Sequence, residues 1–409
     1  RGEQGAAGGR RSGIPWLLAG AVLLALQFLA GHVEISVYSL MVLGLYALWR
    51  LAGIWLKTRQ LAVVARGAGA AAGMVLLGIG LGAIQWIPLY ELVSRSFRQA
   101  SASYADVIGW AYPTRQIITF FIPDFFGNPS HHGYWDVVSR QWTPITHNAL
   151  GEPIQSIFWG IKNYVEAGSY VGVLPLLLAA LALIGRRTRT VWFFALLALV
   201  SLLFAFGAPL YAVLYYLVPG FKQLHSPFRW IYPYTVCVSV LAGIGANWLC
   251  GAASQVPARR LGRAALLAGA AGLGGLLASL AAPGPFVALG EWVLRRSDLA
   301  QTAFPDGRAF YSYQFRNLLI FCGALALSGL AIYLAGRPLR LPRWAGGGPA
   351  WKPLALLAVT LELFVIGYGF NPAVEPALLD FRPPVVDFLL ARQAVEAPFR
   401  FTTFNAPGE

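Results

Sequence analysis

The feature that most constrains this chain is its series of long apolar stretches that contain almost no charged residues. An α-helix needs about 20 mainly apolar residues to cross the hydrocarbon core of a bilayer. About nine stretches of this kind follow one another, at residues 14–31, 34–55, 68–90, 169–185, 191–207, 230–250, 264–282, 317–336 and 353–370. The sequence therefore predicts an all-α polytopic membrane protein with about nine transmembrane helices.

The composition agrees with this class and excludes others. Hydrophobic residues make up 57% of the chain and charged residues 12%, whereas soluble proteins carry about a quarter charged residues. The net charge of +14 would be compatible with nucleic-acid binding. However, the basic residues lie at the ends of apolar stretches and form no dense patch, so we expect no nucleic-acid partner. Redox chemistry is also unexpected, because Cys237, Cys250 and Cys322 lie in apolar stretches without a CxxC pair.

The charges alternate between successive connections. One set carries many basic residues and hardly any acids, for example Arg50, Arg187 and Arg260, and the alternate set holds nearly all Asp and Glu. By the positive-inside rule the first set is cytoplasmic. The sequence thus predicts a multi-pass protein of a cytoplasmic membrane whose C-terminal end lies outside, together with the loops 91–168, 208–229 and 283–316.

Two domains are expected. Residues 1–370 form the transmembrane helical domain, with 91–168 as its large outer loop. Residues 371–409 read as the start of an extracytoplasmic domain, because a Pro-rich segment leads into a helical VVDFLLARQAV and a strand-like FRFTTF. The chain opens with Arg1 and no Met, and we expect it to be a piece of a longer protein that extends beyond both of its ends.

The region from Asp124 to Gly172 gathers acidic, amide, imidazole and aromatic side chains more densely than any other. Polar and aromatic groups in a loop between apolar helices are expected to bind ligands or do chemistry. Asp124 follows a proline on a tight turn, in an arrangement suited to positioning a sugar or polar head group. The alternative is an ordinary turn-forming aspartate. Nearby residues of the same character are Asn128, Tyr134 and Trp135.

Other candidates lie at the outer ends of the predicted helices. His32 and Glu34 occupy the first outer turn, where an ionisable pair faces either a water-filled cavity or simply solvent. Glu166 precedes the fourth stretch, between Tyr164 and Tyr170. Its carboxylate is placed to act as a general base or to orient a substrate hydroxyl. The alternative is an acid at a helix start within an aromatic belt.

Several basic residues follow the short segment 209–220. This segment begins with Pro, ends with Gly and is too short to cross a bilayer. Lys222, His225 and Arg229 are expected at the outer membrane surface, where cations recognise anionic head groups. Interfacial snorkelling is the competing interpretation. Glu362 is the one acid well inside a predicted span, and we expect it to face other helices or a cavity.

Metal binding has weak support in the sequence. His131, His132 and Asp136 are close together, but no HExxH, DxD or CxxC motif is present. We therefore predict no metal-ligand residues and no certain cofactor, with a divalent metal left open.

Five segments carry a family resemblance. In order they are AGHVEISVYSL, QWIPLYELVSRSFR, IPDFFGNP followed by GYW, NYVEAGSYVGVLPLLLAALAL, and VPGFKQLHSPFRWIYPYTVCVSVLAGIGANWL. Together they resemble the YfhO-type bacterial membrane proteins, which are related to GT-C glycosyltransferases. The resemblance extends over about residues 20–400.

The resemblance implies an enzyme of the bacterial cytoplasmic membrane. It would transfer a sugar from a polyprenyl-phosphate donor to a cell-envelope glycan or lipid acceptor on the outer face, with membrane lipid as a further partner. The residues expected to act catalytically are Asp124, Glu166 and Glu34. The residues expected to bind substrate are His32, Asn128, Tyr134, Trp135, Tyr164, Tyr170, Lys222, His225 and Arg229.

Two other functions fit a polytopic chain. One is a transporter or flippase of lipid-linked sugars, and the other is a non-catalytic envelope-assembly protein. A carrier is expected to show internal repeats and broken helices with polar groups near the membrane midplane. This sequence shows no clear repeat, and its polar groups gather at the outer edge, so the enzyme is favoured over the carrier.

Overall fold

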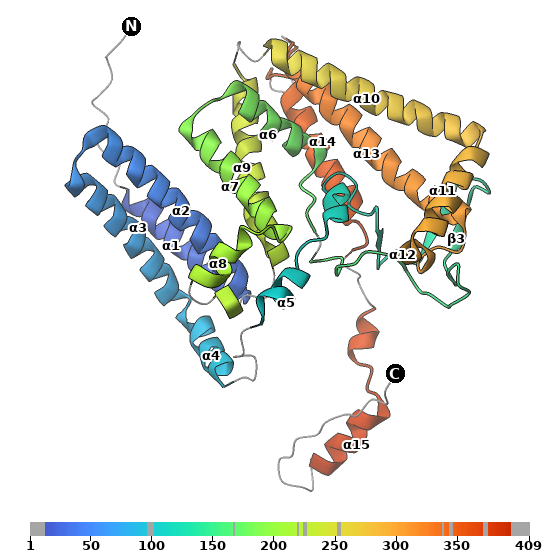
Figure 1. Ribbon diagram of the computed structural model, residues 1–409, viewed down its shortest axis with the longest axis horizontal. Helices are drawn as coiled ribbons and strands as arrows, with labels where there is room; N and C mark the ends of the chain where they lie inside the picture. Colours follow the sequence, from blue (N-terminus) through green and yellow to red (C-terminus); the bar gives the residue numbers. More distant parts are fainter. Residues whose placement is uncertain are drawn as a thin grey trace. The chain divides into compact units, whose positions relative to one another are not determined.

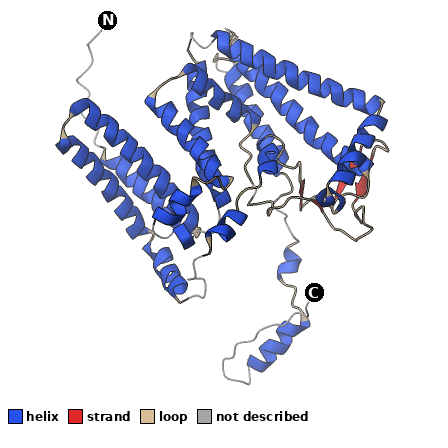
Figure 2. Cartoon of the chain, viewed as in Figure 1, coloured by secondary structure: helices blue, strands red, loops and turns tan. Residues whose placement is uncertain are grey.

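A computed structural model describes residues 13–95, 102–166, 168–218, 221–223, 227–251, 255–337, 339–342, 347–370 and 375–393. Helices make up most of these residues (Figure 2). The chain divides into two units, residues 1–366 and residues 367–409, and each is described by itself.

The first unit begins with a group of antiparallel helices (Figure 1). Helix α2 starts after His32, whose ring Nδ1 accepts the backbone N–H of Ile35 at 3.4 Å and so caps the helix. Helices α1 and α3 pack closely because Gly78 leaves room for Leu24. The members of this group are α1 (Ile14–Leu29), α2 (Val33–Thr58), α3 (Leu61–Leu81) and α4 (Ala83–Ser94).

A second group packs around α9, which contacts α2, α6 and α7. Its core is aromatic: Trp230 is buried and meets Tyr38 and Phe204 edge to face, with ring centroids 5.2 Å and 4.7 Å apart. The group contains α6 (Val173–Gly185), α7 (Arg189–Ala205), α8 (Tyr211–Leu217), the short 3₁₀ helices η3 (Phe221–Gln223) and η4 (Pro227–Trp230), and α9 (Ile231–Leu249).

Helices α10 and α13 lie side by side along most of their length (Figure 1). Their backbones touch at glycines: a Cβ atom on Gly262, Gly269 or Gly329 would meet the facing backbone at less than 3 Å. This part contains α10 (Gln255–Ala281), α11 (Gly284–Arg296), α12 (Asp298–Gln301), α13 (Gly307–Ala335) and α14 (Trp351–Gly367).

The connection between α4 and α6 contains short strands as well as short helices. Strands β2 and β3 form an antiparallel hairpin in which Trp135 lies opposite Trp142, and β1 pairs antiparallel with β4. The elements are α5 (Tyr104–Gly109), η2 (Thr114–Phe120), β1 (Gly127–Asn128), β2 (Gly133–Asp136), β3 (Gln141–Pro144) and β4 (Ile157–Phe158). The all-α description therefore holds for the apolar segments, while the loop adds two small sheets.

Every predicted apolar stretch overlaps a helix, but not all of these helices are long. Among the described residues, four helices are long and apolar enough to cross a membrane: Glu34–Thr58, Leu61–Leu81, Val256–Ala281 and Gly307–Ala335. Large apolar side chains such as Leu76 and Phe364 lie exposed on helix surfaces, at 69% and 75%. Surfaces of this kind suit lipid better than water, as expected of a membrane protein.

Two predicted boundaries were wrong. The stretch predicted at 68–90 is divided between α3 and α4 by a turn at Gly82. Helix α13 begins at Gly307, well before the predicted start at residue 317, because the Asp306 carboxylate accepts the Ala309 backbone N–H at 2.8 Å and caps it. Polar residues 306–316, expected in an outer loop, therefore belong largely to a helix.

The second unit contains η7 (Pro376–Leu379) and α15 (Pro384–Gln393). Helix α15 coincides with most of the helical segment predicted in the tail. The strand-like FRFTTF lies outside the described residues.

Replacing Gly245 with alanine is expected to destabilise the packing of α6 against α9. An added Cβ atom would lie 1.9 Å from the Leu178 carbonyl oxygen, so the helices must separate, at a cost of about 1–3 kcal/mol in unfolding free energy. Thermal unfolding in lipid or detergent measures this. Gly243→Ala on the same helix is the matched control, because no atom lies within 4 Å of its Cβ position. Equal melting temperatures for both variants would contradict the packing described here.

Candidate functional site

A cavity of about 460 Å³ joins three segments that are far apart in the sequence: the start of α2, the residues before α6, and the junction of η4 with α9. It brings together His32, Glu166 and Arg229, which were singled out separately in the sequence. The complete lining is His32, Ile35, Val165, Glu166, Gly168, Phe228, Arg229, Ile231, Tyr232 and Thr235.

Arg229 and Glu34 form an ion pair beside this cavity, with 24% and 15% of their side chains exposed. Glu34 lies in the first turn of α2, where the helix dipole favours an acid. Because the pair is largely removed from water, loss of one partner leaves a poorly solvated charge on the other. The pair therefore fixes the guanidinium at the cavity wall.

The residues that follow Arg229 are anchored to α2. Trp230 is buried against Tyr38 of α2. The Tyr232 and Ser39 hydroxyls are hydrogen-bonded at 2.8 Å. These contacts connect the end of η4 and the start of α9, directly after Arg229, to α2.

Lys162 adds a second cation close to Glu166. Its Nζ lies 5.5 Å from the centroid of the Phe228 ring, which lines the cavity. Burial lowers the pKa of Lys162, and the negative charge of Glu166 acts in the opposite direction. Glu166 is thus the one carboxylate among the residues that line the cavity, and it makes no ion pair with another described residue.

Asp124 lies in a separate buried cluster and does not line this cavity. Its Oδ1 accepts the Tyr164 hydroxyl at 2.5 Å and the Asn128 amide at 3.3 Å, and its Oδ2 lies 3.6 Å from the Arg316 guanidinium. Asn317 donates to the Asp124 backbone carbonyl at 3.0 Å. The structure thus separates Asp124 from His32 and Glu166, because side chains of α13 hold Asp124 in its own cluster.

The same cluster contains His131, whose Nδ1 lies 2.8 Å from the Tyr313 hydroxyl. Burial lowers the pKa of His131, while the negative charge of Asp124 acts in the opposite direction. Burial raises the pKa of Tyr164, and its contact with Asp124 adds to that shift. The Tyr164 hydroxyl therefore stays protonated and donates to the carboxylate.

Asp136 fastens the β2–β3 hairpin to α13. Its carboxylate pairs with Arg308 at 2.5 Å and accepts the hydroxyls of Ser139 at 2.7 Å and Ser312 at 3.3 Å. Burial alone would raise its pKa, but the bonds from Arg308 and Ser139 outweigh burial and lower it to about 2.

Acid is expected to release this hairpin. The pKa of Asp136 is about 2 when docked and near its ordinary 3.8 when released. Docking therefore gains about 2 kcal/mol above pH 4, which is lost as the pH falls from about 4 to 2. Hydrogen exchange of the hairpin amides measures the change, and Asp136→Asn should show fast exchange already at pH 7. Glu91→Gln, in the exposed pair with Arg95, is the control. Unchanged exchange in Asp136→Asn would contradict this anchoring role.

The remaining predicted residues have varied surroundings. Tyr134 is buried, and burial raises its pKa to about 12. Trp135 is exposed. The Tyr170 hydroxyl donates to Glu362, which is buried and also accepts the Val173 backbone N–H at 3.0 Å.

The basic segment is described only in part. Lys222 is exposed, with its Nζ 5.6 Å and 5.9 Å from the ring centroids of Tyr215 and Tyr216. It is not among the residues that line the cavity. His225 lies outside the described residues.

The histidines of the loop have separate partners. His132 Nδ1 lies 2.8 Å from the Gln155 carbonyl oxygen, whereas His131 contacts Tyr313. Within the described part of the chain, no three His, Cys, Asp or Glu side chains converge as a metal site requires.

Three cluster residues were missed in the sequence: Tyr313, Arg316 and Asn317, all on α13. The run YQFRN at 313–317 was the available signal. A helix that carries an amide and a guanidinium next to an apolar stretch needs polar partners. The interpretation of residues 283–316 as a loop concealed this requirement.

No protein-family model matches the sequence, and neither a curated protein nor a solved structure matches it.

Proposed function

We propose that this protein is a membrane glycosyltransferase that uses a polyprenyl-phosphate sugar and acts at the outer face of the bacterial cytoplasmic membrane. The observation that supports this most is the cavity that Glu166 lines together with His32 and with Arg229 of the Arg229–Glu34 pair. A carboxylate opposite cations is the combination that such a transfer requires. The resemblance of the sequence to YfhO-type proteins points to the same class.

The chemistry assigns one part to each side of the cavity. Glu166 takes the proton of an acceptor hydroxyl while the oxygen of that hydroxyl attacks the anomeric carbon of the donor sugar. The bond from that carbon to the phosphate oxygen breaks, and polyprenyl phosphate leaves with the bonding electrons. Arg229 stabilises the charge that develops on this phosphate, with His32 and Lys162 near it. The proton stays on Glu166 until solvent removes it.

The Asp124 cluster is assigned a positioning part in this proposal. Both of its carboxylate oxygens are already engaged. Tyr164 connects it to the segment that carries Val165 and Glu166, which both line the cavity. The cluster therefore fixes one end of that segment.

In the proposed topology all nine apolar segments cross the membrane, and the connection that carries Glu166 lies outside. The alternation of basic and acidic connections supports this orientation. A cysteine placed at Ser156 is then expected to react with an impermeant maleimide added to whole cells, whereas one at Thr188 reacts only after lysis. The opposite pattern would overturn the orientation and the outer-face site together.

A reconstituted activity assay tests the function. Wild-type protein in proteoliposomes should release polyprenyl phosphate from a lipid-linked sugar when a glycan acceptor is present. Thr235→Phe, which fills the cavity from α9, should reduce this release by about tenfold or more. Ser239→Phe is the matched control, because Ser239 lies one turn further along α9, exposed and outside the lining.

Two outcomes would count against the proposal. The first is an absence of release with every donor tested, from protein that is correctly inserted and folded. The second is movement of intact lipid-linked sugar between leaflets without transfer, which would favour a carrier.

A further inference from the structure

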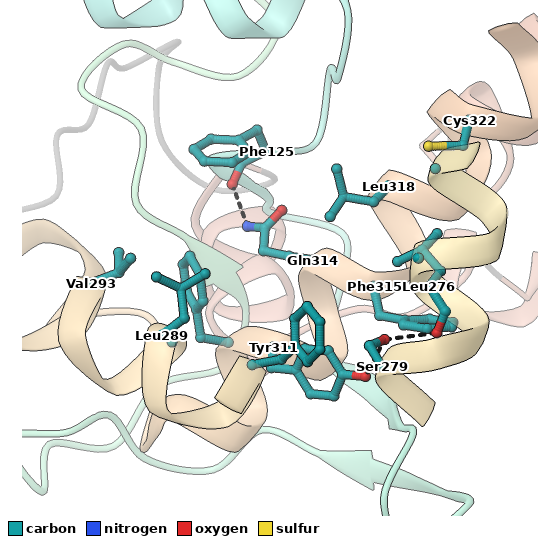
Figure 3. Close-up of a pocket in the computed structure, with 15 residues that line it drawn as sticks. Phe125, Leu276, Ser279, Leu289, Val293, Tyr311, Gln314, Phe315, Leu318 and Cys322 are labelled. Atoms are coloured by element: carbon teal, nitrogen blue, oxygen red, sulfur yellow. Dashed lines mark hydrogen bonds between the residues drawn. The ribbon is translucent and has the colours of Figure 1, made fainter. Parts of the chain in front are cut away.

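A second cavity, of about 490 Å³, lies between α10, α11 and α13 (Figure 3). Its walls are almost wholly apolar. Leu276 comes from α10, Leu289 and Val293 from α11, and Phe315 and Leu318 from α13. The volume falls in the range of sites that bind small ligands, about 300–1,000 Å³.

The few polar groups in this cavity already have partners, as the dashed lines in Figure 3 show. The hydroxyls of Ser279 and Tyr311 bond each other at 2.8 Å, and the Gln314 amide donates to the Phe125 carbonyl at 2.8 Å. Gln314 also accepts from Asn317 at 3.1 Å. A polar ligand would therefore lose its hydrogen bonds to water without gaining new ones in the cavity. A hydrocarbon chain has no such hydrogen bonds to lose.

The surroundings indicate the source of the hydrocarbon. Helices α10 and α13 each contain a segment long and apolar enough to cross a membrane. Helix α11 is amphipathic: Phe286, Leu289 and Val293 face the cavity, while exposed Trp292 lies under the Arg296 guanidinium at 4.5 Å. Such helices lie at the membrane interface, with aromatic and basic groups at head-group level.

Arg296 supplies charge complementarity for a head group. It lies in the last turn of α11, over the exposed Trp292 ring, and Arg295 precedes it, paired with Glu291 at 3.5 Å. Cations at this level attract anionic phospholipid.

We propose that this cavity binds one acyl chain of an anionic phospholipid, with the lipid phosphate near Arg296. The chain fills the space between α10, α11 and α13, and the phosphate exchanges water for the guanidinium. This binding does not depend on glycosyl transfer.

Occupancy of the cavity also affects the Asp124 cluster. Phe125 lines the cavity and adjoins Asp124, and Gln314 and Asn317 join the two by hydrogen bonds. A bound chain packs against Phe125 and Gln314 and so supports the cluster from its apolar side.

The test is photocrosslinking of the full chain in liposomes that contain phosphatidylglycerol with a diazirine on one acyl chain. Gly275→Phe should reduce labelling of the α10 and α13 peptides by about tenfold, because Gly275 lines the cavity and its Cβ position faces open space. Gly274→Phe is the matched control, since its Cβ position is equally open but lies outside the lining. Its labelling should equal that of wild type.

A second variant and a second lipid complete the test. Val293→Trp fills the cavity from α11 and should give the same loss if Gly275→Phe does not fold. Arg296→Ala should remove the preference for phosphatidylglycerol over phosphatidylcholine with the same chain. Equal labelling of the two Gly variants would overturn the proposal. Labelling by a polyprenyl phosphate probe but not by the phospholipid probe would also overturn it, as would the finding that a second copy of the chain covers the cavity and excludes the phospholipid probe.

Discussion

Glutamine at position 166 is expected to lower the turnover number of sugar transfer by about a hundredfold or more, while donor KM changes by less than about threefold. Glutamine keeps the size and polarity of the side chain but does not accept the acceptor's proton. Because the loss is confined to the step in which the proton moves, it appears in kcat. Steady-state kinetics in proteoliposomes separates the two constants.

The control for this variant is Glu152→Gln. Glu152 belongs to the same connection, is exposed, and is absent from the cavity lining. Its turnover number should stay within about twofold of wild type. A Glu166→Gln protein with normal kcat would remove the general-base role and leave Glu166 as a charge beside Lys162.

Alanine at position 229 is expected to weaken use of the lipid-linked donor by about tenfold or more. The guanidinium is fixed by Glu34 and by the packing of Trp230, so a phosphate in the cavity meets a preorganised donor of charge-assisted hydrogen bonds. Donor binding to inserted protein measures the effect. Arg187→Ala, at an exposed position between α6 and α7, should bind donor as wild type does.

The Arg229→Ala change also removes the ion-pair partner of Glu34, and a second variant separates the effect on stability from the effect on donor binding. In Glu34→Ala with Arg229→Ala the uncompensated charge is gone, so thermal stability should recover while donor binding stays weak. Recovery of binding together with stability would show that Arg229 acts only on the fold. Normal donor affinity in Arg229→Ala would remove the phosphate-binding role altogether.

Much of the helical framework could be predicted from the sequence, because apolar length is a local property. The helix positions follow from uncharged runs, and the turn at His32 was expected because it lies between the first two of them. The early start of α13 could not be predicted in this way, since it depends on the Asp306 cap and on partners for Arg308 and Arg316 in a distant loop.

The candidate site shows the same limit. His32, Glu166 and Arg229 were identifiable because each ionisable group lies at the end of an apolar run. That they line one cavity depends on how α2 and α9 pack, which no single segment reveals. The location of the Asp124 side chain could not be predicted for the same reason, since its partner Arg316 comes almost two hundred residues later in the sequence.

The connection between α4 and α6 links α13 to the cavity. Asp124 and Asp136 fasten it to the first turns of α13, while Val165, Glu166 and Gly168 close the cavity beside α2 and α9. A shift of α13 therefore reaches the cavity wall by a short path, from Arg316 to Asp124 and from Asp124 to Tyr164, which directly precedes Val165. The two helix groups are therefore coupled through the Tyr164–Asp124 hydrogen bond as well as through the direct packing of α6 against α13.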